Sequence, residues 1–125
     1  MTVVGVGIDI VSIERIARID ARYGERFRQR ILAAGELAAC PPEGTAAFLA
    51  KRFAAKEALA KALGTGFSDG VHFAEIEVTR NDKGRPGLRL HGSTRRMADA
   101  LGVREMHLSL ADERRYAVAH VLLVG

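Results

Sequence analysis

Two acidic residues occupy positions that an ordinary folding pattern does not require, and the first is Asp9. It lies between Ile8 and Ile10 in an otherwise apolar stretch. A buried carboxylate is costly unless it is hydrogen-bonded, paired with a cation or bound to a metal. Asp9 therefore either ends a strand and caps the helix that follows it, or serves as a ligand. Its position alone leaves both interpretations open.

The second acidic residue is Glu57, which lies in the middle of a strongly helical segment, with Phe53 four residues earlier and Lys61 four residues later. Residues at this spacing share one face of a helix. An exposed Glu57–Lys61 pair contributes only about 0.3–0.5 kcal/mol, and it is the alternative to a functional role. If Glu57 and Asp9 pack into the same core, the two carboxylates suit Mg²⁺, which typically takes one or two protein carboxylates and fills its other positions with water and phosphate oxygens. Lys61 would then bind the same phosphate.

Two glycine-containing segments are further candidates for phosphate binding. The first follows the helix of Glu57, and the second lies in a turn: Gly64, Thr65 and Gly66, then Lys83, Gly84, Arg85 and Pro86. Glycine lets a ligand approach the backbone, and Lys and Arg supply positive charge. Each segment taken alone is more often a helix stop or a turn.

Arginines form one stripe along the first expected helix. Arg15, Arg18 and Arg22 stand at i, i+3 and i+7, and Arg26 continues the row. Such a row is often only a solvated face, but acidic residues do not alternate with it as they do on a helix laced with salt bridges. The net charge of +4 also favours an acidic partner. We therefore expect the stripe to dock an acidic partner.

The elements that must position these residues can be predicted from the same pattern. The β-branched run at residues 3–8 indicates a buried strand that ends near Asp9. Ser12 is a suitable N-cap for a helix that Gly24 stops. Thr45 to Leu63 is the strongest helix, because helix formers dominate it and Gly64 occupies the C′ position. Short helices are expected between these two, at residues 25–33 and 35–40.

The C-terminal half is expected to form two hairpins. Residues 75–79 and 88–90 alternate on either side of a turn at 81–84, and residues 106–110 and 116–124 bracket a turn at 112–115. Ser93 is the expected N-cap of a short helix between the hairpins. Five strands with helices between them predict a single α+β domain over residues 1–125, with a mostly antiparallel sheet and a long central helix.

Length and composition exclude several classes of protein. The 125 residues fit one domain, and 48% hydrophobic with 27% charged residues is an ordinary globular mixture. No apolar run approaches the roughly 20 residues that span a bilayer. The N-terminus lacks a basic leader and a cleavage site, so we expect a cytoplasmic protein. The chain has one cysteine, no Trp and 6% aromatic residues, which excludes an internal disulfide and leaves few stacking platforms for single-stranded nucleic acid.

The residues around these candidates resemble the two signature segments of the holo-acyl-carrier-protein synthases, the small bacterial phosphopantetheinyl transferases. The first segment reads Gly-Ile-Asp-Ile-Val at residues 7–11. The second runs from Phe48 through Lys-Glu-Ala at residues 56–58 to Gly-Thr-Gly at residues 64–66. The resemblance extends to Gly-Arg-Pro at residues 84–86 and to the last hairpin, so it covers nearly the whole chain.

The resemblance implies an enzyme that transfers 4′-phosphopantetheine from coenzyme A to a serine of apo-acyl carrier protein and releases adenosine 3′,5′-bisphosphate, in support of fatty acid synthesis. It implies Mg²⁺ held by Asp9 and Glu57, with Lys61 as a further catalytic residue. It also implies the phosphopantetheinyl transferase fold and a homotrimer whose active sites lie between neighbouring subunits. Coenzyme A would bind Lys61, Gly64, Thr65 and Gly66 of one subunit and Lys83, Gly84, Arg85, Pro86 and His107 of another. The acidic carrier protein would bind Arg15, Arg18, Arg22 and Arg26, and neither nucleic acid nor a membrane is an expected partner.

One departure from the family pattern and two rival classes bear on this hypothesis. Many family members carry Ser-His where this chain has Ala111 and Asp112, so no ligand role of that histidine is transferred to this chain. A basic nucleic-acid-binding module would use the arginine stripe and have no need of Asp9 or Glu57. A coenzyme A-binding scaffold that has lost transfer activity would keep the site but modify no carrier protein.

Overall fold

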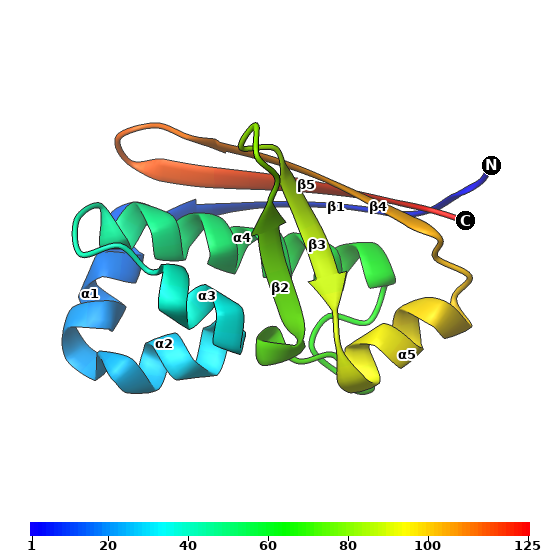
Figure 1. The fold of residues 1–125 in the computed structure, drawn as a ribbon, viewed down its shortest axis with the longest axis horizontal. Helices are drawn as coiled ribbons and strands as arrows, with labels where there is room; N and C mark the ends of the chain where they lie inside the picture. The colour runs from blue at the N-terminus through cyan, green and yellow to red at the C-terminus, as the bar shows by residue number, and fades with distance from the viewer.

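The computed structural model describes residues 1–125 and divides the strands between two antiparallel sheets. The larger sheet has the strand order β1-β5-β4, with bounds Val3–Ser12, Tyr116–Val124 and Glu105–Asp112. The smaller sheet is the hairpin of β2 (Ile76–Arg80) and β3 (Pro86–Leu90). The two chain ends lie together at one end of the larger sheet (Figure 1), where Thr2 and Gly125 exchange backbone hydrogen bonds. The prediction of a small, mostly antiparallel α+β domain is therefore confirmed.

β1 is an edge strand whose two faces differ sharply. Gly7 and Val11 on the inner face are buried, whereas Val6, Ile8 and Ile10 on the outer face are 55%, 60% and 63% exposed. The register continues this alternation across the sheet, because Val6, Ile8 and Ile10 pair with Leu122, His120 and Val118 of β5. One side of the larger sheet thus faces the core, and the other presents an apolar outer face along β1.

The expectation that the first strand ends near Asp9 is wrong. Asp9 pairs with Ala119, and pairing with β5 continues to Ser12 opposite Tyr116. The neighbouring strand supplies backbone hydrogen bonds beyond the polar residue, so the change in side-chain polarity does not end the strand. Asp9 also does not cap the following helix, since Ser12 performs that role by accepting a hydrogen bond from the Arg15 N–H (3.2 Å).

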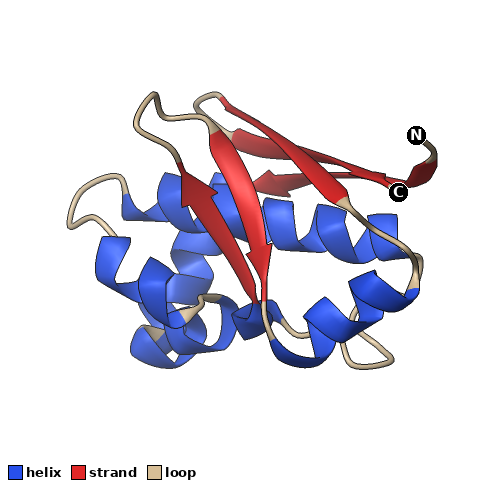
Figure 2. Cartoon of the chain, turned by 45° about the vertical axis from the view of Figure 1, so that its right-hand side comes forward, coloured by secondary structure: helices blue, strands red, loops and turns tan.

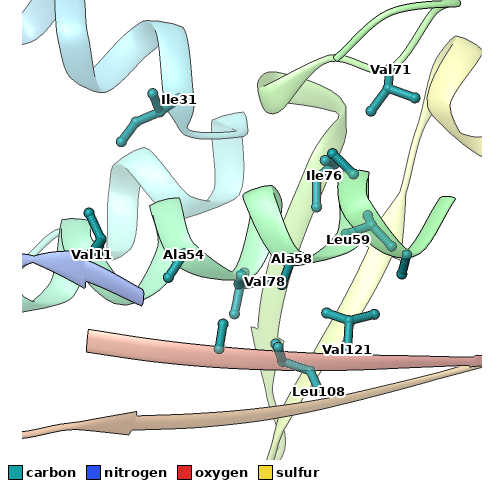
Figure 3. Close-up of a cluster of buried hydrophobic side chains, with 14 of the residues drawn as sticks. Val11, Ile31, Ala54, Ala58, Leu59, Val71, Ile76, Val78, Leu108 and Val121 are labelled. Atoms are coloured by element: carbon teal, nitrogen blue, oxygen red, sulfur yellow. The ribbon is translucent and has the colours of Figure 1, made fainter. Parts of the chain in front are cut away.

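The long helix α4 (Thr45–Leu63) packs beneath the larger sheet and has the bounds that the sequence predicted. Gly64 ends it in a left-handed conformation with φ 85°, as its C′ position requires. Figure 3 shows Ala58 and Leu59 of α4 between Val121 of β5 on one side and Ile76 of β2 on the other. Because neighbours cover α4 on several sides, its buried residues are not confined to one stripe. No helix has the length and apolar character needed to cross a bilayer.

The other helices lie along the side of α4 that faces away from the larger sheet (Figures 1 and 2). Three of them gather near the N-terminal end of α4, namely α1 (Ile13–Tyr23), α2 (Glu25–Ile31) and α3 (Ala34–Ala39). α5 (Gly92–Ala100) lies towards the other end of α4, and the short η1 (Phe73–Glu75) lies between the two groups, at the start of β2. Ser93 is not the N-cap of α5 as expected: the helix begins at Gly92 after His91, and the hydroxyl of Ser93 is bonded to other segments.

Three buried charged side chains connect α3, α4 and β2. Nζ of Lys56 lies 2.5 Å from Oε1 of Glu36, and Nε of Arg52 lies 3.1 Å from Oε2 of Glu36. The same carboxylate accepts the backbone N–H groups of Ala33 (2.8 Å) and Val78 (3.1 Å). Burial lowers the pKa of Lys56, and the charge of Glu36 opposes that shift. Removing one partner of such a pair leaves an uncompensated charge at a cost of about 3–5 kcal/mol, so these residues fix how α4 sits in the fold.

Candidate active site

The site is built where β1 lies unusually close to α4. Gly5 and Gly7 are on the inner face of β1, and a Cβ atom on either would overlap the backbone carbonyl of Ala62 or Ala58. Glycine is therefore required for this approach of strand to helix. Asp9 follows Gly7 on the same face, and Glu57 and Lys61 immediately precede the two contacted alanines. The packing brings the three predicted catalytic residues together.

Lys61 makes its ion pair with Asp9. Its Nζ lies 3.0 Å from Oδ1 of Asp9 and donates a second hydrogen bond to the backbone carbonyl of Ile8 (2.9 Å). The Asp9 side chain is 16% exposed and that of Lys61 53%, so the carboxylate is sheltered and the ammonium reaches solvent. The alternative of an isolated Glu57–Lys61 surface pair does not describe this arrangement, because the ammonium is held across the strand–helix contact.

Glu57 adds a second carboxylate next to Asp9. Partial burial and then the negative charge of Asp9 raise the pKa of Glu57, while Lys61 and Arg15 oppose the shift. Two carboxylates close enough to repel one another favour a bound cation. The structure contains no group of three or more His, Cys, Asp or Glu side chains suited to enclosing a metal. Asp9 and Glu57 fit Mg²⁺, which commonly binds through one or two carboxylates and leaves positions for phosphate.

A groove runs along the exposed edge of β1 at this point. It has a volume of about 440 Å³ and is lined by Ile8, Asp9, Ile10, Lys61 and Val118. The groove combines the polar pair Asp9–Lys61 from the inner side with apolar side chains of the outer face. It gives a bound group access to both charges from the edge of the sheet.

The first glycine segment extends from this same helix. Gly64 and Gly66 both have positive φ, 85° and 61°, and a Cβ on either would meet open space. Their backbone therefore needs glycine, and it stays accessible to a ligand. Because Gly64 follows Lys61 by three residues, the structure brings residues 64–66 to the end of the helix that carries Glu57 and Lys61.

Within one chain the other expected coenzyme A residues are not brought to this place. Lys83, Gly84 and Arg85 are exposed in the β2–β3 turn, with Pro86 at the start of β3, and this turn stands at the end of the hairpin away from η1 (Figure 1). His107 pairs with Leu122, which pairs with Val6, so it shares their outer face of the larger sheet. Its Nε2 lies 3.2 Å from Glu105. His107 and Asp9 are therefore on opposite faces of one sheet.

Arg15, Arg18 and Arg22 of the arginine stripe are exposed on α1, whereas Arg26 is exposed on α2, after the break at Gly24. The stripe is not free of acidic neighbours. Arg18 pairs with Glu14 at 3.0 Å, whereas Arg15, Arg22 and Arg26 have no carboxylate partner among the ion pairs of the structure. Arg26 lines a groove of about 540 Å³ between α1 and α2 together with apolar residues, among them Ile19 and Phe27. The surface therefore offers positive charge beside an apolar depression.

Gly5 and Gly7 act through packing and were not among the candidate residues. Alternate glycines in a β-branched run are nevertheless a recognisable signal of close backbone approach. At the point where Ser-His is replaced, Oδ1 of Asp112 lies 3.7 Å from Nζ of Lys51 in α4. This ion pair ties the end of β4 to the helix, and no local pattern in the sequence indicated it.

This chain is similar in sequence and fold to proteins of one known family. A sequence model of the 4′-phosphopantetheinyl transferase superfamily matches residues 5–120. The holo-[acyl-carrier-protein] synthase of Halorhodospira halophila is 58% identical over 123 residues, 98% of each chain, and that of Alkalilimnicola ehrlichii is 51% identical over 97% of this chain and 96% of its own. Among solved structures, the Neisseria meningitidis holo-[acyl-carrier-protein] synthase has a TM-score of 0.93 at 37% identity and covers 99% of this chain and 100% of its own. The Helicobacter pylori enzyme in complex with coenzyme A has a TM-score of 0.84 at 29% identity, covering 95% and 99%. The chain belongs to the 4′-phosphopantetheinyl transferase superfamily, and within it to the holo-[acyl-carrier-protein] synthases.

Proposed function

We propose that this enzyme transfers 4′-phosphopantetheine from coenzyme A to a serine of apo-acyl carrier protein in a Mg²⁺-dependent reaction that releases adenosine 3′,5′-bisphosphate. The observation that carries the proposal is the Asp9–Lys61 ion pair in the groove at the edge of β1, with the carboxylate of Glu57 close enough to feel the charge of Asp9. The product would serve fatty acid synthesis, and a coenzyme A-dependent modification of this kind belongs in the cytoplasm.

Charge neutralisation and positioning dominate the chemistry, because the attacked phosphorus belongs to a pyrophosphate. Asp9 and Glu57 would hold Mg²⁺, which when bound supplies positive charge for the pyrophosphate oxygens. Lys61 is held at the same place by Asp9 and the carbonyl of Ile8, and its exposed ammonium adds a second positive charge beside the departing group. The site therefore orients the phosphate for attack by the serine hydroxyl.

A homotrimer with sites between subunits explains the placement of the remaining residues. His107 and the β2–β3 turn lie away from Asp9 within one chain, whereas the outer face of β1 exposes three large apolar side chains, two of which line the groove. An exposed apolar patch of this kind is typical of a protein interface. A neighbour packed on it would supply His107, Lys83, Gly84, Arg85 and Pro86 to complete the coenzyme A site that begins at Lys61, Gly64, Thr65 and Gly66.

The carrier protein would dock on α1 and the start of α2. Arg15, Arg22 and Arg26 offer unpaired positive charge, and Arg18 can exchange its exposed pair with Glu14 for a carboxylate of the partner. Exposed ion pairs are worth at most about 1 kcal/mol, so this exchange costs little. The groove between α1 and α2 would accept an apolar side chain of the carrier.

The deciding experiment incubates the protein with apo-acyl carrier protein, coenzyme A and Mg²⁺ and measures the mass of the carrier. We expect the carrier to gain the phosphopantetheine mass, and to gain none when EDTA removes the metal. Binding of coenzyme A without any gain in mass would indicate a scaffold that has lost transfer activity. Salt-dependent micromolar binding of DNA or RNA without turnover would indicate the nucleic-acid-binding alternative.

A further inference from the structure

Glu75, at the junction of η1 and β2, carries a carboxylate that backbone and hydroxyl groups of Ser93 and Thr94 surround. Oε1 lies 3.0 Å from the backbone N of Thr94, 2.8 Å from Oγ1 of Thr94 and 2.9 Å from Oγ of Ser93, and Oε2 accepts the backbone N–H of Ser93 (3.2 Å). Partial burial alone would raise the pKa of Glu75, but the hydrogen bonds from Thr94 and Ser93 outweigh it and lower the pKa to about 2. The carboxylate is therefore firmly held as an anion at the start of α5.

The backbone around this carboxylate is shaped to receive it. Gly92, the first residue of α5, has φ 57°, and a Cβ atom there would overlap Oε2 of Glu75. The backbone N–H of His91 also donates to the carbonyl of Glu75 (2.9 Å). Both the side chain and the main chain of Glu75 thus fix the junction between β3 and α5.

The two hydroxyls that meet Glu75 also hold the loop that follows α4. Oγ of Ser93 donates to the carbonyl of Gly70 at 2.6 Å, and Oγ1 of Thr94 accepts the backbone N–H of His72 at 3.0 Å. A hydroxyl has one proton, so Thr94 can donate to Glu75 while it accepts from His72. The Ser93 hydroxyl lies near two acceptors and donates to the closer one, the carbonyl of Gly70, while Glu75 holds Ser93 through its backbone N–H. Glu75, Ser93, Thr94 and the backbone of residues 70–72 form one connected network, which we call the Glu75 network.

This network anchors one end of a loop whose other end is the terminus of α4. The loop covers residues 64–72, and it begins with the open glycine backbone of Gly64 and Gly66. Near its middle, Phe67 stacks on Phe73 with a centroid distance of 3.9 Å. Without the Glu75 network, residues 70–72 would lose the side-chain hydrogen bonds that join them to α5.

We propose that Glu75 is a positioning residue for coenzyme A: through Ser93 and Thr94 it holds residues 70–72, and so it fixes the loop that presents Gly64, Thr65 and Gly66. The inference rests on the proposed function, because it takes residues 64–66 as part of the coenzyme A site. Glu75 itself touches no reacting group. Glu75 changes the fraction of molecules in which the loop is already ordered before coenzyme A binds. The apparent affinity for coenzyme A falls in proportion to that fraction.

The test compares Glu75→Gln with Glu77→Gln in the full-length protein. Gln keeps the size of the side chain but replaces one acceptor oxygen by an NH₂ group that faces N–H donors. Glu77 is the matched control, because it stands two residues away and bonds His91 (3.0 Å), the residue just before α5, but forms no hydrogen bond with residues 70–72. Steady-state kinetics are measured separately for coenzyme A and carrier protein, and hydrogen–deuterium exchange is measured on residues 64–72 without coenzyme A.

In Glu75→Gln we expect the KM for coenzyme A to rise about fivefold to tenfold, with kcat and the KM for the carrier protein changed by less than about twofold. Exchange in residues 66–72 should quicken by about tenfold while that of β5 stays unchanged. Glu77→Gln should leave both readouts at wild-type values. If Glu75→Gln does not fold, Ser93→Ala makes the same comparison, because it removes the hydroxyl that holds Gly70.

The proposal is overturned if a folded Glu75→Gln protein keeps wild-type exchange in the loop and a wild-type KM for coenzyme A. An equal rise of the KM for coenzyme A in Glu77→Gln also overturns the proposal, since any carboxylate near α5 would then have the same effect. Failure of the proposed function looks different. If the wild-type protein transfers nothing and does not bind coenzyme A, the proposed function fails. Faster hydrogen–deuterium exchange of the loop in Glu75→Gln would then still show that Glu75 orders residues 70–72.

Discussion

The backbone of Gly7 in β1 lies directly against the carbonyl of Ala58 in α4, with no room for a side chain between them. Glu57 immediately precedes this contact in the helix, and Asp9 follows it by two residues on the same face of the strand. The distance between the two carboxylates therefore depends on a glycine that carries no chemistry of its own.

Replacing Gly7 by Ala should move α4 away from β1. Overpacking of this kind costs about 1–3 kcal/mol, and transfer activity should fall more than stability because the separation of Asp9 and Glu57 changes. Urea unfolding and the carrier mass assay measure the two effects. Gly35→Ala is the control, because a Cβ there would meet only the flexible end of the Glu77 side chain. Wild-type activity in Gly7→Ala would contradict this account of the site.

Glu57→Gln should lower turnover by orders of magnitude with the fold retained, because the change keeps size and helix propensity and removes a charged oxygen ligand. Asp9→Asn should act in the same way, and high Mg²⁺ should partly restore activity in both. A surface pair would cost under about 1 kcal/mol and leave activity alone. Glu43→Gln, an exposed carboxylate in the loop before α4 that forms no ion pair, is the control. Near-wild-type transfer by a variant at limiting Mg²⁺ would remove that residue from the site and turn attention to Glu14.

Reversing charge at Arg22 should weaken binding of the carrier protein more than binding of coenzyme A. An acidic partner is steered by the charge of the stripe, so the KM for the carrier should rise in Arg22→Glu, and the rise should shrink as salt screens the interaction. Arg15→Glu should behave similarly. Arg96→Glu in α5, at the other end of α4, should leave both KM values unchanged. An increase confined to the KM for coenzyme A would assign the stripe to the nucleotide site instead.

Ile10→Arg should yield an inactive monomer, because it places a charge on the apolar outer face of β1, where the side chain is 63% exposed in the single chain. Light scattering reports the mass and the carrier assay reports activity. Leu101→Arg is the matched control, since Leu101 is also an exposed apolar residue but follows α5, away from this face. A wild-type protein that is a fully active monomer at micromolar concentration would overturn the trimer proposal.

Glu75 should make part of the stability depend on pH in the acid range. Its pKa is lowered from 4.5 to about 2 in the folded chain, so its contribution is present above about pH 4.5 and is lost as the pH falls towards 2. After allowance for solvent screening, we expect on the order of 1–2 kcal/mol. Urea unfolding of wild type and Glu75→Gln should differ by this amount at pH 6 and converge near pH 2. A difference that does not change with pH would mean that the carboxylate charge contributes nothing.

The sequence by itself determined most of the elements, because their signals are local. Helix formers from Thr45 to Leu63 with Gly64 behind them fix α4, and Ser12 and Gly24 bound α1. The hairpins follow from alternation on either side of turn residues. The candidate site residues Asp9, Glu57 and Lys61 could also be named, since each was a charge with an unusual sequence context or a familiar family pattern.

Only the tertiary structure decided how far the strands extend and which groups face one another. β1 continues past Asp9 because β5, more than a hundred residues later, supplies its hydrogen bonds. Lys61 binds Asp9 across the strand–helix contact, and His107 lies on the opposite face of the sheet because of its pairing with Leu122. Ser93 holds Gly70 and does not cap its helix. In each case the partner is distant in the sequence. Which groups pair therefore depends on the packing of the whole chain, which no local sequence pattern reports.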